Sequence, residues 1–296
     1  MSVSAEFLAA RWQTAPEALP GLAADWLDRD WVARFESWAV PPTTARLFVL
    51  QEDGPAGAAT AATMPDPRVA YELFQRYAGE GQQLTLLLNH TERVAPELRE
   101  LRDGLGIGNP WRHDDVVATL STAGSGIGYH AGHEDSLVVQ LAGRRHWRAW
   151  SADHVPASHR HELVWRHAPE GPGAIRRPAA DPLVDCELGP GDVLYVPSLF
   201  PHEGRTLELS VSLSIAWRGV SVATLLDEVE ALPAAERTLT ERHPDAFLRL
   251  VRDPPPGAPD ACAAVMEQLD PALRALRVSA TEREWVRRSV DELLAG

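Results

Sequence analysis

Histidines and carboxylates crowd into two short segments that lie far apart in the sequence. The first holds His130, His133, Glu134 and Asp135 behind the glycine-rich run STAGSGIGY. The second is VPSLFPHEG, in which two prolines frame a single histidine, His202. Ferrous oxygenases bind iron through two histidines and one carboxylate on one face of the site. The two segments therefore predict a metal held inside a small β-barrel.

The usual arrangement on such a barrel is His-x-Asp on one strand and a distant histidine on another. His202 is the expected distant ligand. The segment HAG at 130–132 supplies a nearer histidine but has glycine at the carboxylate position. The segment HED at 133–135 is a literal His-x-Asp, and residues i and i+2 of an extended strand face the same side. The sequence thus offers two registers for the metal-binding strand.

Short strands separated by turns are expected from residue 115 onwards. Examples are VVATLS, SLVVQLAG, HWRAW and VLYVP, and the segment LELSVSLSIAW at 207–217 alternates apolar with small polar residues. Such alternation is typical of a strand with one buried face. Many short strands of this kind favour an antiparallel barrel or jelly roll. The low-complexity segment at 53–67 is expected to be a loop.

Helical patterns flank the strands on both sides. We expect residues 1–114 to form helices and strands that pack on the barrel, 115–219 to form the barrel, and 220–296 to form a helical subdomain. The tryptophans before residue 40 recur near helical spacing, so they are expected to pack in the core rather than to form a ligand cage. The predicted fold class is therefore mainly β with helices, an α+β protein.

The sequence resembles the Jumonji-type cupin family of bacterial and eukaryotic ribosomal oxygenases. The matching blocks are STAGSGIGYH, VVQLAGRRHWRAW, LGPGDVLYVPSLFPHEG and LSVSLSIAWRG, within roughly residues 20–220. Members of this family have a double-stranded β-helix (cupin or jelly roll) barrel and are protein hydroxylases that depend on iron(II) and 2-oxoglutarate. The resemblance implies Fe(II) and 2-oxoglutarate as cofactors, hydroxylation of a protein or peptide side chain, and a homodimer formed through the C-terminal helices.

The resemblance also implies roles for individual residues. Laid without gaps, it places the two metal-binding histidines on His130 and His202. The basic residue that pairs with the far carboxylate of 2-oxoglutarate falls on Arg145, where a guanidinium on a rigid strand can bind a carboxylate through two hydrogen bonds. A hydroxyl that assists the same carboxylate falls on Ser121. The metal-binding aspartate of the family falls on Gly132, which is a departure from the family pattern.

Three interpretations of the third ligand are open. In the first, a local shift of the strand lets Asp135 or Glu134, with or without His133, complete the ligand set of a protein hydroxylase. In the second, two histidines alone bind iron and leave a position for halide, which favours an oxygenase or halogenase that tailors a peptide or small-molecule natural product. In the third, metal binding is weak or lost, and the chain is an inactive cupin-like binding protein.

Net charge, the lengths of apolar runs and the cysteine positions limit the expected binding partners and location of the protein. The chain of 296 residues has a net charge of −14, which disfavours non-specific binding of nucleic acid and is compatible with a basic partner, including a basic ribosomal protein. No apolar run is long enough to span a membrane, and no secretory signal is evident at the N-terminus. Cys186 and Cys262 lack metal-type spacing, so we expect reduced thiols in a cytoplasmic protein.

Overall fold

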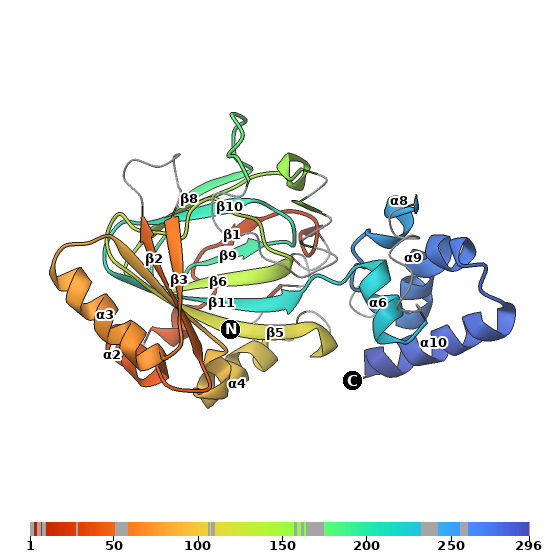
Figure 1. Ribbon diagram of the computed structural model, residues 1–296, viewed down its shortest axis with the longest axis horizontal. Coiled ribbons are helices and arrows are strands. Elements are labelled where there is room, and N and C mark those ends of the chain that lie inside the picture. Colours follow the sequence, from red (N-terminus) through yellow and green to blue (C-terminus); the bar gives the residue numbers. More distant parts are fainter. Residues whose placement is uncertain are drawn as a thin grey trace.

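The computed structural model describes residues 3–4, 7, 10–27, 29–50, 59–105, 107, 110–156, 159–160, 163, 175–231, 242–254 and 260–295. Within these residues two β-sheets lie against each other, with helices on the outside of the larger sheet and a group of helices at one end of the barrel (Figure 1). Facing antiparallel sheets with helices outside them confirm the predicted jelly-roll fold of the α+β class.

The larger sheet has the strand order β1-β9-β6-β11-β5-β4-β2-β3, and its strands pair in antiparallel fashion. The strands are β1 (Glu17–Leu19), β2 (Thr44–Leu50), β3 (Ala59–Met64), β4 (Leu84–Asn89), β5 (His113–Ser121), β6 (Glu134–Ala142), β9 (Val193–Val196) and β11 (Ser210–Arg218). The smaller sheet has the order β10-β7-β8, with bounds β7 (Arg145–Ala149), β8 (Val184–Leu188) and β10 (His202–Thr206).

The central strands of the larger sheet have one apolar and one polar face. On β11 the odd-numbered residues Val211, Leu213 and Ile215 are fully buried in the main core, whereas Ser212 and Ser214 line a cavity between the sheets. Because side chains alternate across a strand, this pattern assigns every residue of the strand to a face. The same rule applied to β6 decides which carboxylate can reach the cavity.

Helices cover the outer, apolar face of the larger sheet. They are α2 (Trp31–Trp38), α3 (Pro67–Gly79) and α4 (Pro96–Gly104). The side chain of Asp30 accepts a hydrogen bond from the backbone N–H of Ala33, which caps the start of α2. The core side chains of α2 are Trp31, Phe35 and Trp38, so the expectation that the early tryptophans pack in the core is confirmed for this helix. Single-turn 3₁₀ helices are η1 (Ala24–Trp26), η2 (Thr91–Arg93), η3 (Pro110–Arg112) and η4 (Ala152–His154).

The C-terminal helices bury a hydrophobic cluster of their own. They are α6 (Val222–Glu228), α8 (Pro244–Phe247), α9 (Ala261–Ala275) and α10 (Ala280–Ala295). Figure 1 shows them at one end of the barrel, after the last strand, β11. In the described part of the chain, no helix combines the length and the apolar character needed to cross a membrane.

Two expectations about local structure were wrong. The segment expected to be a loop at 53–67 contains β3 at Ala59–Met64, which pairs with β2 along its whole length. The sequence of β3 consists mostly of alanine and threonine and lacks an alternation of apolar and polar residues. This strand is therefore stabilised by its pairing with β2 and could not be recognised from its sequence pattern. The alternating strand begins at Ser210 rather than at residue 207, since Leu207 and Leu209 are 37% and 48% exposed on the turn that precedes it.

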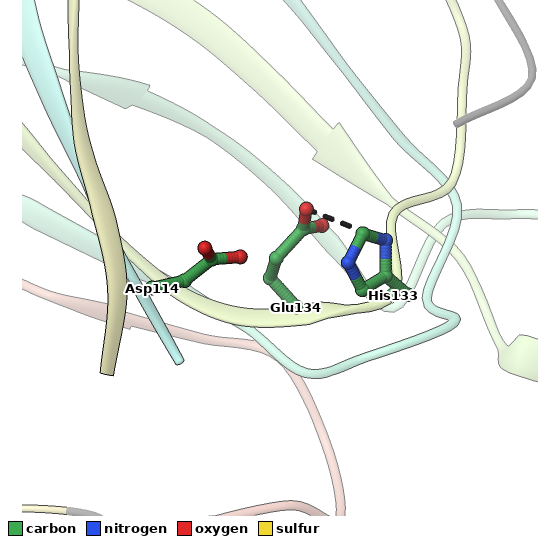
Figure 2. Close-up of side chains that lie close together, drawn as sticks. All are labelled: Asp114, His133 and Glu134. Carbon is green, nitrogen blue, oxygen red and sulfur yellow. Dashed lines mark ion pairs between the residues drawn. The ribbon is translucent and has the colours of Figure 1, made fainter. Parts of the chain in front are cut away.

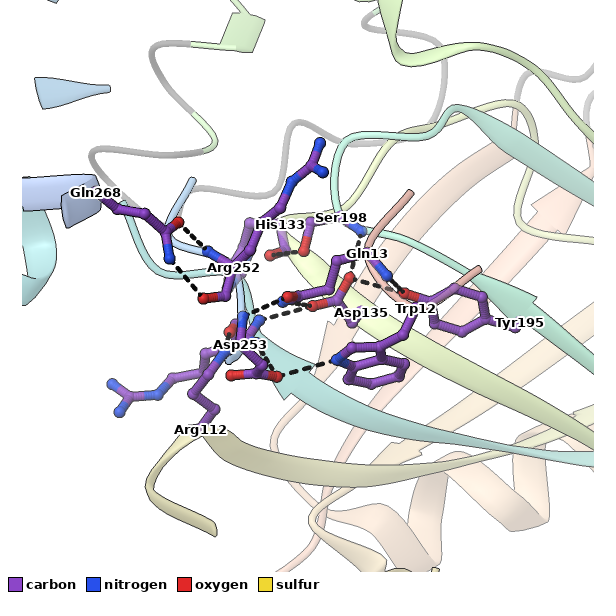
Figure 3. Close-up of polar contacts among 11 residues, drawn as sticks. Trp12, Gln13, Arg112, His133, Asp135, Tyr195, Ser198, Arg252, Asp253 and Gln268 are labelled. Carbon is purple, nitrogen blue, oxygen red and sulfur yellow. Dashed lines mark hydrogen bonds and ion pairs between the residues drawn. The ribbon is translucent and has the colours of Figure 1, made fainter. Parts of the chain in front are cut away.

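A buried arginine joins the barrel to the C-terminal region (Figure 3). Arg112 is 1% exposed, and its Nη2 donates to Oδ2 of Asp135 at 2.6 Å while its Nη1 donates to Oδ2 of Asp253 at 2.7 Å. The other oxygen of Asp135 accepts from the hydroxyl of Tyr195 at 3.2 Å and from the backbone N–H of Ser198 at 3.0 Å. Asp135 is therefore anchored on the core side of β6 by groups from three other segments.

We expect the substitution Asp135→Asn to lower the free energy of unfolding by about 3 kcal/mol, because it leaves a buried guanidinium without one of its two charged partners. Urea denaturation followed by circular dichroism measures this. The matched control is Asp185→Asn, since the carboxylate of Asp185 is 53% exposed and pairs only with His146. The control should change the free energy by less than about 1 kcal/mol. Equal effects of the two substitutions would contradict a structural role of the buried pair.

Candidate metal centre

A cavity of about 460 Å³ lies between the two sheets. Its wall is formed by polar and charged side chains that include both candidate histidines, the candidate arginine and three carboxylates, namely Arg46, Asn89, His90, Asp114, Asp115, Thr119, His130, His133, Glu134, Arg145, His202, Ser212 and Ser214. Apolar side chains such as Val117, Val138, Trp147 and Val196 complete the wall. A cavity of this size with a few convergent polar groups is the usual form of a ligand-binding site.

His130 and His202 meet across the gap between the sheets. Their backbones exchange two hydrogen bonds, of 3.0 and 2.8 Å, as an isolated antiparallel bridge. Their ring centroids are 4.3 Å apart. The Nδ1 atom of each ring lies 2.9 Å from a backbone carbonyl oxygen, that of Gly128 for His130 and that of Phe200 for His202. Each Nδ1 therefore carries the proton, and each Nε2 is left with the lone pair that a metal requires.

Burial keeps both rings neutral. It lowers the pKa of His130 to about 3, with a further contribution from the neighbouring His202, and it lowers the pKa of His202. A histidine must be neutral to bind a metal, so both rings are ready for coordination at neutral pH. The structure thus brings together the two histidines that the sequence singled out.

Glu134 occupies the space that a side chain at position 132 would take. A Cβ atom built on Gly132 would lie 2.6 Å from Oε2 of Glu134, which is far inside contact distance. Glu134 starts β6 and faces the cavity together with Ser136 and Val138, as the alternation of the strand requires. Burial raises the pKa of Glu134 to about 7. The carboxylate of Glu134 therefore lies beside Gly132, the position on which the aspartate of the family pattern falls.

The expectation that Asp135 is the third ligand is corrected by its position. Its side chain is 1% exposed, lies on the opposite face of β6 from Glu134, and is held by Arg112, Tyr195 and Ser198. It is not part of the cavity wall. The His-x-Asp motif at 133–135 suggested a ligand at residue 135. The side chain of Asp135 instead points into the core, where it pairs with Arg112, and this contact fixes which residues of β6 face the cavity.

His133 belongs to a second group of potential ligands on the same wall. One ligand atom from each of Asp114, His133 and Glu134 lies within 4.8 Å of the other two (Figure 2). The Nδ1 atom of His133 is 3.4 Å from Oε1 of Glu134. Burial, with the nearby charges of Asp115 and Glu134, raises the pKa of Asp114 to about 6. Asp114 was missed in the sequence, because no pattern distinguishes it from the other acidic residues near the start of a strand.

Arg145 is a buried cation aimed into the cavity. It is 2% exposed, its Nη1 lies 3.2 Å from Oγ of Ser212, and its Nη2 lies 3.4 Å from the carbonyl oxygen of Gly204. Its guanidinium also stacks over Trp147 at 4.8 Å. Among the described residues no carboxylate lies within ion-pair distance of it, and its buried Nε has no hydrogen-bond partner. Burial lowers its pKa to about 10, so it stays charged at neutral pH and favours an anion beside it.

Ser121 ends β5 on the same face as Val117 and Thr119, which line the cavity. It is fully buried, and its hydroxyl lies 3.1 Å from that of Thr85. The hydroxyl that touches Arg145 belongs instead to Ser212 on β11. The sequence of β11 could have indicated Ser212, because the small polar residues of this strand alternate with apolar core residues and so face the cavity.

The residues of this wall fit a ferrous ion and 2-oxoglutarate. Two neutral imidazoles and one carboxylate are the donor types that non-haem iron(II) takes, and His130, His202 and Glu134 supply them from one cavity wall. Among the described residues, the ligand atoms that already lie within 4.8 Å of one another are those of Asp114, His133 and Glu134, so Glu134 would have to turn towards the histidine pair to bind the same ion. The unpaired Nε of Arg145 and its lack of a carboxylate partner among the described residues fit the far carboxylate of a dicarboxylic co-substrate.

The substitution Gly132→Ala tests whether Glu134 is a ligand. The new methyl group would displace the carboxylate of Glu134, so we expect anaerobic Fe(II) affinity to fall at least about tenfold. The flexible end of Glu134 can move, so the fold should persist. Gly189→Ala is the control, because its nearest neighbour is 3.7 Å away. If Gly132→Ala and Glu134→Gln both leave the affinity unchanged, Glu134 is not a ligand and the site has only two histidines.

Comparison with known proteins finds relatives for the central part of the chain. Residues 103–225 match the model of the JmjC domain. The chain is 30% identical over 167 residues to the ribosomal protein uL16 3-hydroxylase of Escherichia coli, a match that covers 54% of this chain and 40% of that protein. It is 23% identical over 150 residues to a probable ribosomal oxygenase of Haemophilus influenzae, covering 50% of this chain and 35% of that protein. The matches therefore span less than half the length of these relatives.

Solved structures agree on the fold. The X-ray structure of E. coli YcfD superimposes with a TM-score of 0.56 at 24% identity, covering 95% of this chain and 69% of that one. The complex of the ribosomal oxygenase YcfD with cobalt and 2-oxoglutarate gives a TM-score of 0.55 at 22% identity, covering 96% and 70%. Residues 103–225 are thus similar to a JmjC domain, and the solved structures agree with the cupin fold of the barrel.

Proposed function

We propose that the chain is an oxygenase dependent on iron(II) and 2-oxoglutarate that hydroxylates a side chain of a protein or peptide. One observation carries this proposal: two histidines whose Nδ1 atoms are fixed by backbone carbonyls share a cavity with a buried arginine that lacks a carboxylate partner among the described residues. A metal site and an anion site in one cavity are what a metal-binding dicarboxylate co-substrate requires.

Each side chain has a defined task in this proposal. His130, His202 and Glu134 would hold the metal, which supplies the activation of dioxygen when bound. Arg145 would bind the far carboxylate of 2-oxoglutarate. The ring of Trp147, which stacks on the guanidinium, would hold that group in place. Val138 and Val196 would shield the site from bulk water.

The presence of Glu134 favours hydroxylation over halogenation. A halide needs the position that a missing carboxylate leaves, and here the carboxylate of Glu134 fills the space beside Gly132. The natural-product halogenase is therefore the weaker alternative. An inactive binding protein is the outcome that a failed metal-binding experiment would leave.

The proposed substrate class comes from the relatives. The E. coli relative is named as a hydroxylase of ribosomal protein uL16, and the H. influenzae relative as a probable ribosomal oxygenase. We propose a basic ribosomal protein as substrate, with which the net charge of −14 is compatible. Encounter between an acidic enzyme and a basic protein is accelerated by their opposite charges. The same relatives suggest that the chain works in the cytoplasm.

The direct test combines metal, co-substrate and substrate. The protein with Fe(II), 2-oxoglutarate and dioxygen should form succinate, which NMR detects, and should add one oxygen atom to a ribosomal protein, which mass spectrometry detects. His202→Ala should abolish both signals while the protein stays folded. Failure of the native protein to bind Fe(II) and 2-oxoglutarate together would refute the oxygenase proposal and leave a binding protein.

Arg145→Met should weaken 2-oxoglutarate binding by roughly 10- to 100-fold, because one charge-assisted pair of hydrogen bonds is lost. Titration of the Fe(II)-loaded protein without oxygen, followed by its visible absorption, measures this. Arg144→Met is the matched control: Arg144 is the preceding residue, is 52% exposed, and pairs with Glu187 and Glu208 on the surface. If both substitutions change the affinity equally, Arg145 is not the co-substrate residue.

The domain boundaries and the homodimer are also proposals. We propose the divisions 1–114, 115–219 and 220–296. The separate hydrophobic cluster of the C-terminal helices supports a subdomain at 220–296, and the cluster shared by the first two parts supports a region 1–114 that packs on the barrel. The homodimer would form through that subdomain, where Trp285 is 39% exposed on α10. Light scattering of the native protein and of Trp285→Ala measures its mass, and a native monomer would refute the dimer.

A further inference from the structure

The second group of potential ligands, Asp114, His133 and Glu134, lies on the cavity wall next to the histidine pair (Figure 2). Asp114 comes from β5, whereas His133 and Glu134 come from the start of β6. One oxygen or nitrogen from each residue lies within 4.8 Å of the others, which is close enough for a single ion to touch all three. The function proposed above uses only Glu134 from this group.

An irregularity in the sheet turns Asp114 into the cavity. Between β5 and β11 the register places Val116 opposite Ile215 and His113 opposite Trp217. Two residues of β5, Asp114 and Asp115, therefore face one residue of β11. Such a bulge re-aims a side chain, and both consecutive aspartates do line the cavity, which a regular strand would not permit.

The residue of β11 between the two flanking strands is small. Ala216 pairs with Ser136 of β6 and lies beside the bulge of β5, and it lines the cavity. A short side chain at this position leaves room above β11 for the carboxylates of Asp114 and Glu134 to approach each other from the two sides. The sheet thereby creates a pocket lined by oxygen donors, with His133 at its edge.

No arginine in the described part of the chain forms an ion pair with this group. The nearby Arg218 pairs with Glu228 at 2.9 Å and donates to the carbonyl oxygen of Trp111. Two partly buried carboxylates so close together repel each other unless one is protonated or a cation lies between them. A divalent cation satisfies this requirement.

The two oxygens of Glu134 have different neighbours. Oε1 lies 3.4 Å from Nδ1 of His133, and Oε2 lies against the backbone of Gly132, two residues after His130 in the sequence. We propose that Asp114, His133 and Glu134 form a second divalent-cation site, and that the carboxylate of Glu134 is shared between this site and the one formed by His130 and His202. The proposal adds to the proposed function and rests on it only for the first metal.

The donor set indicates the class of cation. One imidazole and two carboxylates suit Mn(II), Fe(II), Co(II) or Zn(II) better than Mg(II) or Ca(II), which prefer oxygen donors alone. The second cation would neutralise the carboxylates at this end of the cavity and hold Glu134 in place for the first metal. The expected behaviour is a chain that binds two transition-metal ions.

The test is the number of Mn(II) ions bound per chain, measured by equilibrium dialysis with elemental analysis and by electron paramagnetic resonance of free Mn(II). The native protein should bind two ions, Asp114→Asn one and His202→Ala one. Glu134→Gln should weaken both sites at least about tenfold. The control is Asp115→Asn, because Asp115 also lines the cavity but accepts a hydrogen bond from Asn89 at 3.0 Å, and it should keep two ions.

The outcomes separate this site from the first one. If Asp114→Asn binds as many ions as the native protein, or if the native protein binds none, the second site does not exist. If the native protein binds one ion that Asp114→Asn loses and His202→Ala keeps, the second site stands and the proposed oxygenase site is refuted. Denaturation curves of each variant show that any loss of binding occurs in folded protein.

Discussion

The ion pair between Arg112 and Asp135 determines which side chains of β6 face the cavity. Both side chains are almost fully buried, and Asp135 is also held by a tyrosine hydroxyl and a backbone N–H. Because residues alternate along a strand, fixing Asp135 on the core side forces Glu134 to the cavity side. Slipping the strand by one residue would bury Glu134 in an apolar core and leave the guanidinium of Arg112 without this partner, so the phase is strongly defined.

In the proposed metal centre, the carboxylate comes from a position two residues further along the chain than the aspartate position of the family pattern. Gly132 and Glu134 are two residues apart at the entry to an extended strand, so they face the same side. Glutamate is one methylene longer than aspartate, which lets its carboxylate reach back over the bare backbone of Gly132. Glycine at 132 and glutamate at 134 therefore belong together: a side chain at 132 would exclude the carboxylate of Glu134. The glycine that looked like a lost ligand in the sequence is the space that the replacement needs.

The predictable part of this molecule follows from local pattern and from block similarity. The barrel, His130, His202 and Arg145 could be identified because strand alternation and the spacing of matching blocks are local properties. The choice between Glu134 and Asp135 could not, because it depends on Arg112 and on Asp253, which lie far away in the sequence. Asp114 was unpredictable for a related reason, since its orientation depends on a bulge that arises from pairing with β11. Similarity alone assigned a role to Ser121, which stays a prediction, whereas the hydroxyl that contacts Arg145 is that of Ser212.

Along β11 the cavity has a positively charged end and a negatively charged end. Its cavity-facing residues run from Ser212, which contacts Arg145, past Ser214 to Ala216, beside which Asp114 and Glu134 converge. Four residues of a strand span about 13 Å, so a cationic end and an anionic end are separated by roughly the length of a small dicarboxylate and a metal ion. An anion enters most favourably at the Arg145 end and a cation at the Asp114 end. The polarity of the cavity thus favours one order of ligands in the proposed site: the dicarboxylate would extend from Arg145 towards the histidines, and metal ions would lie at the histidines and at the Asp114 end.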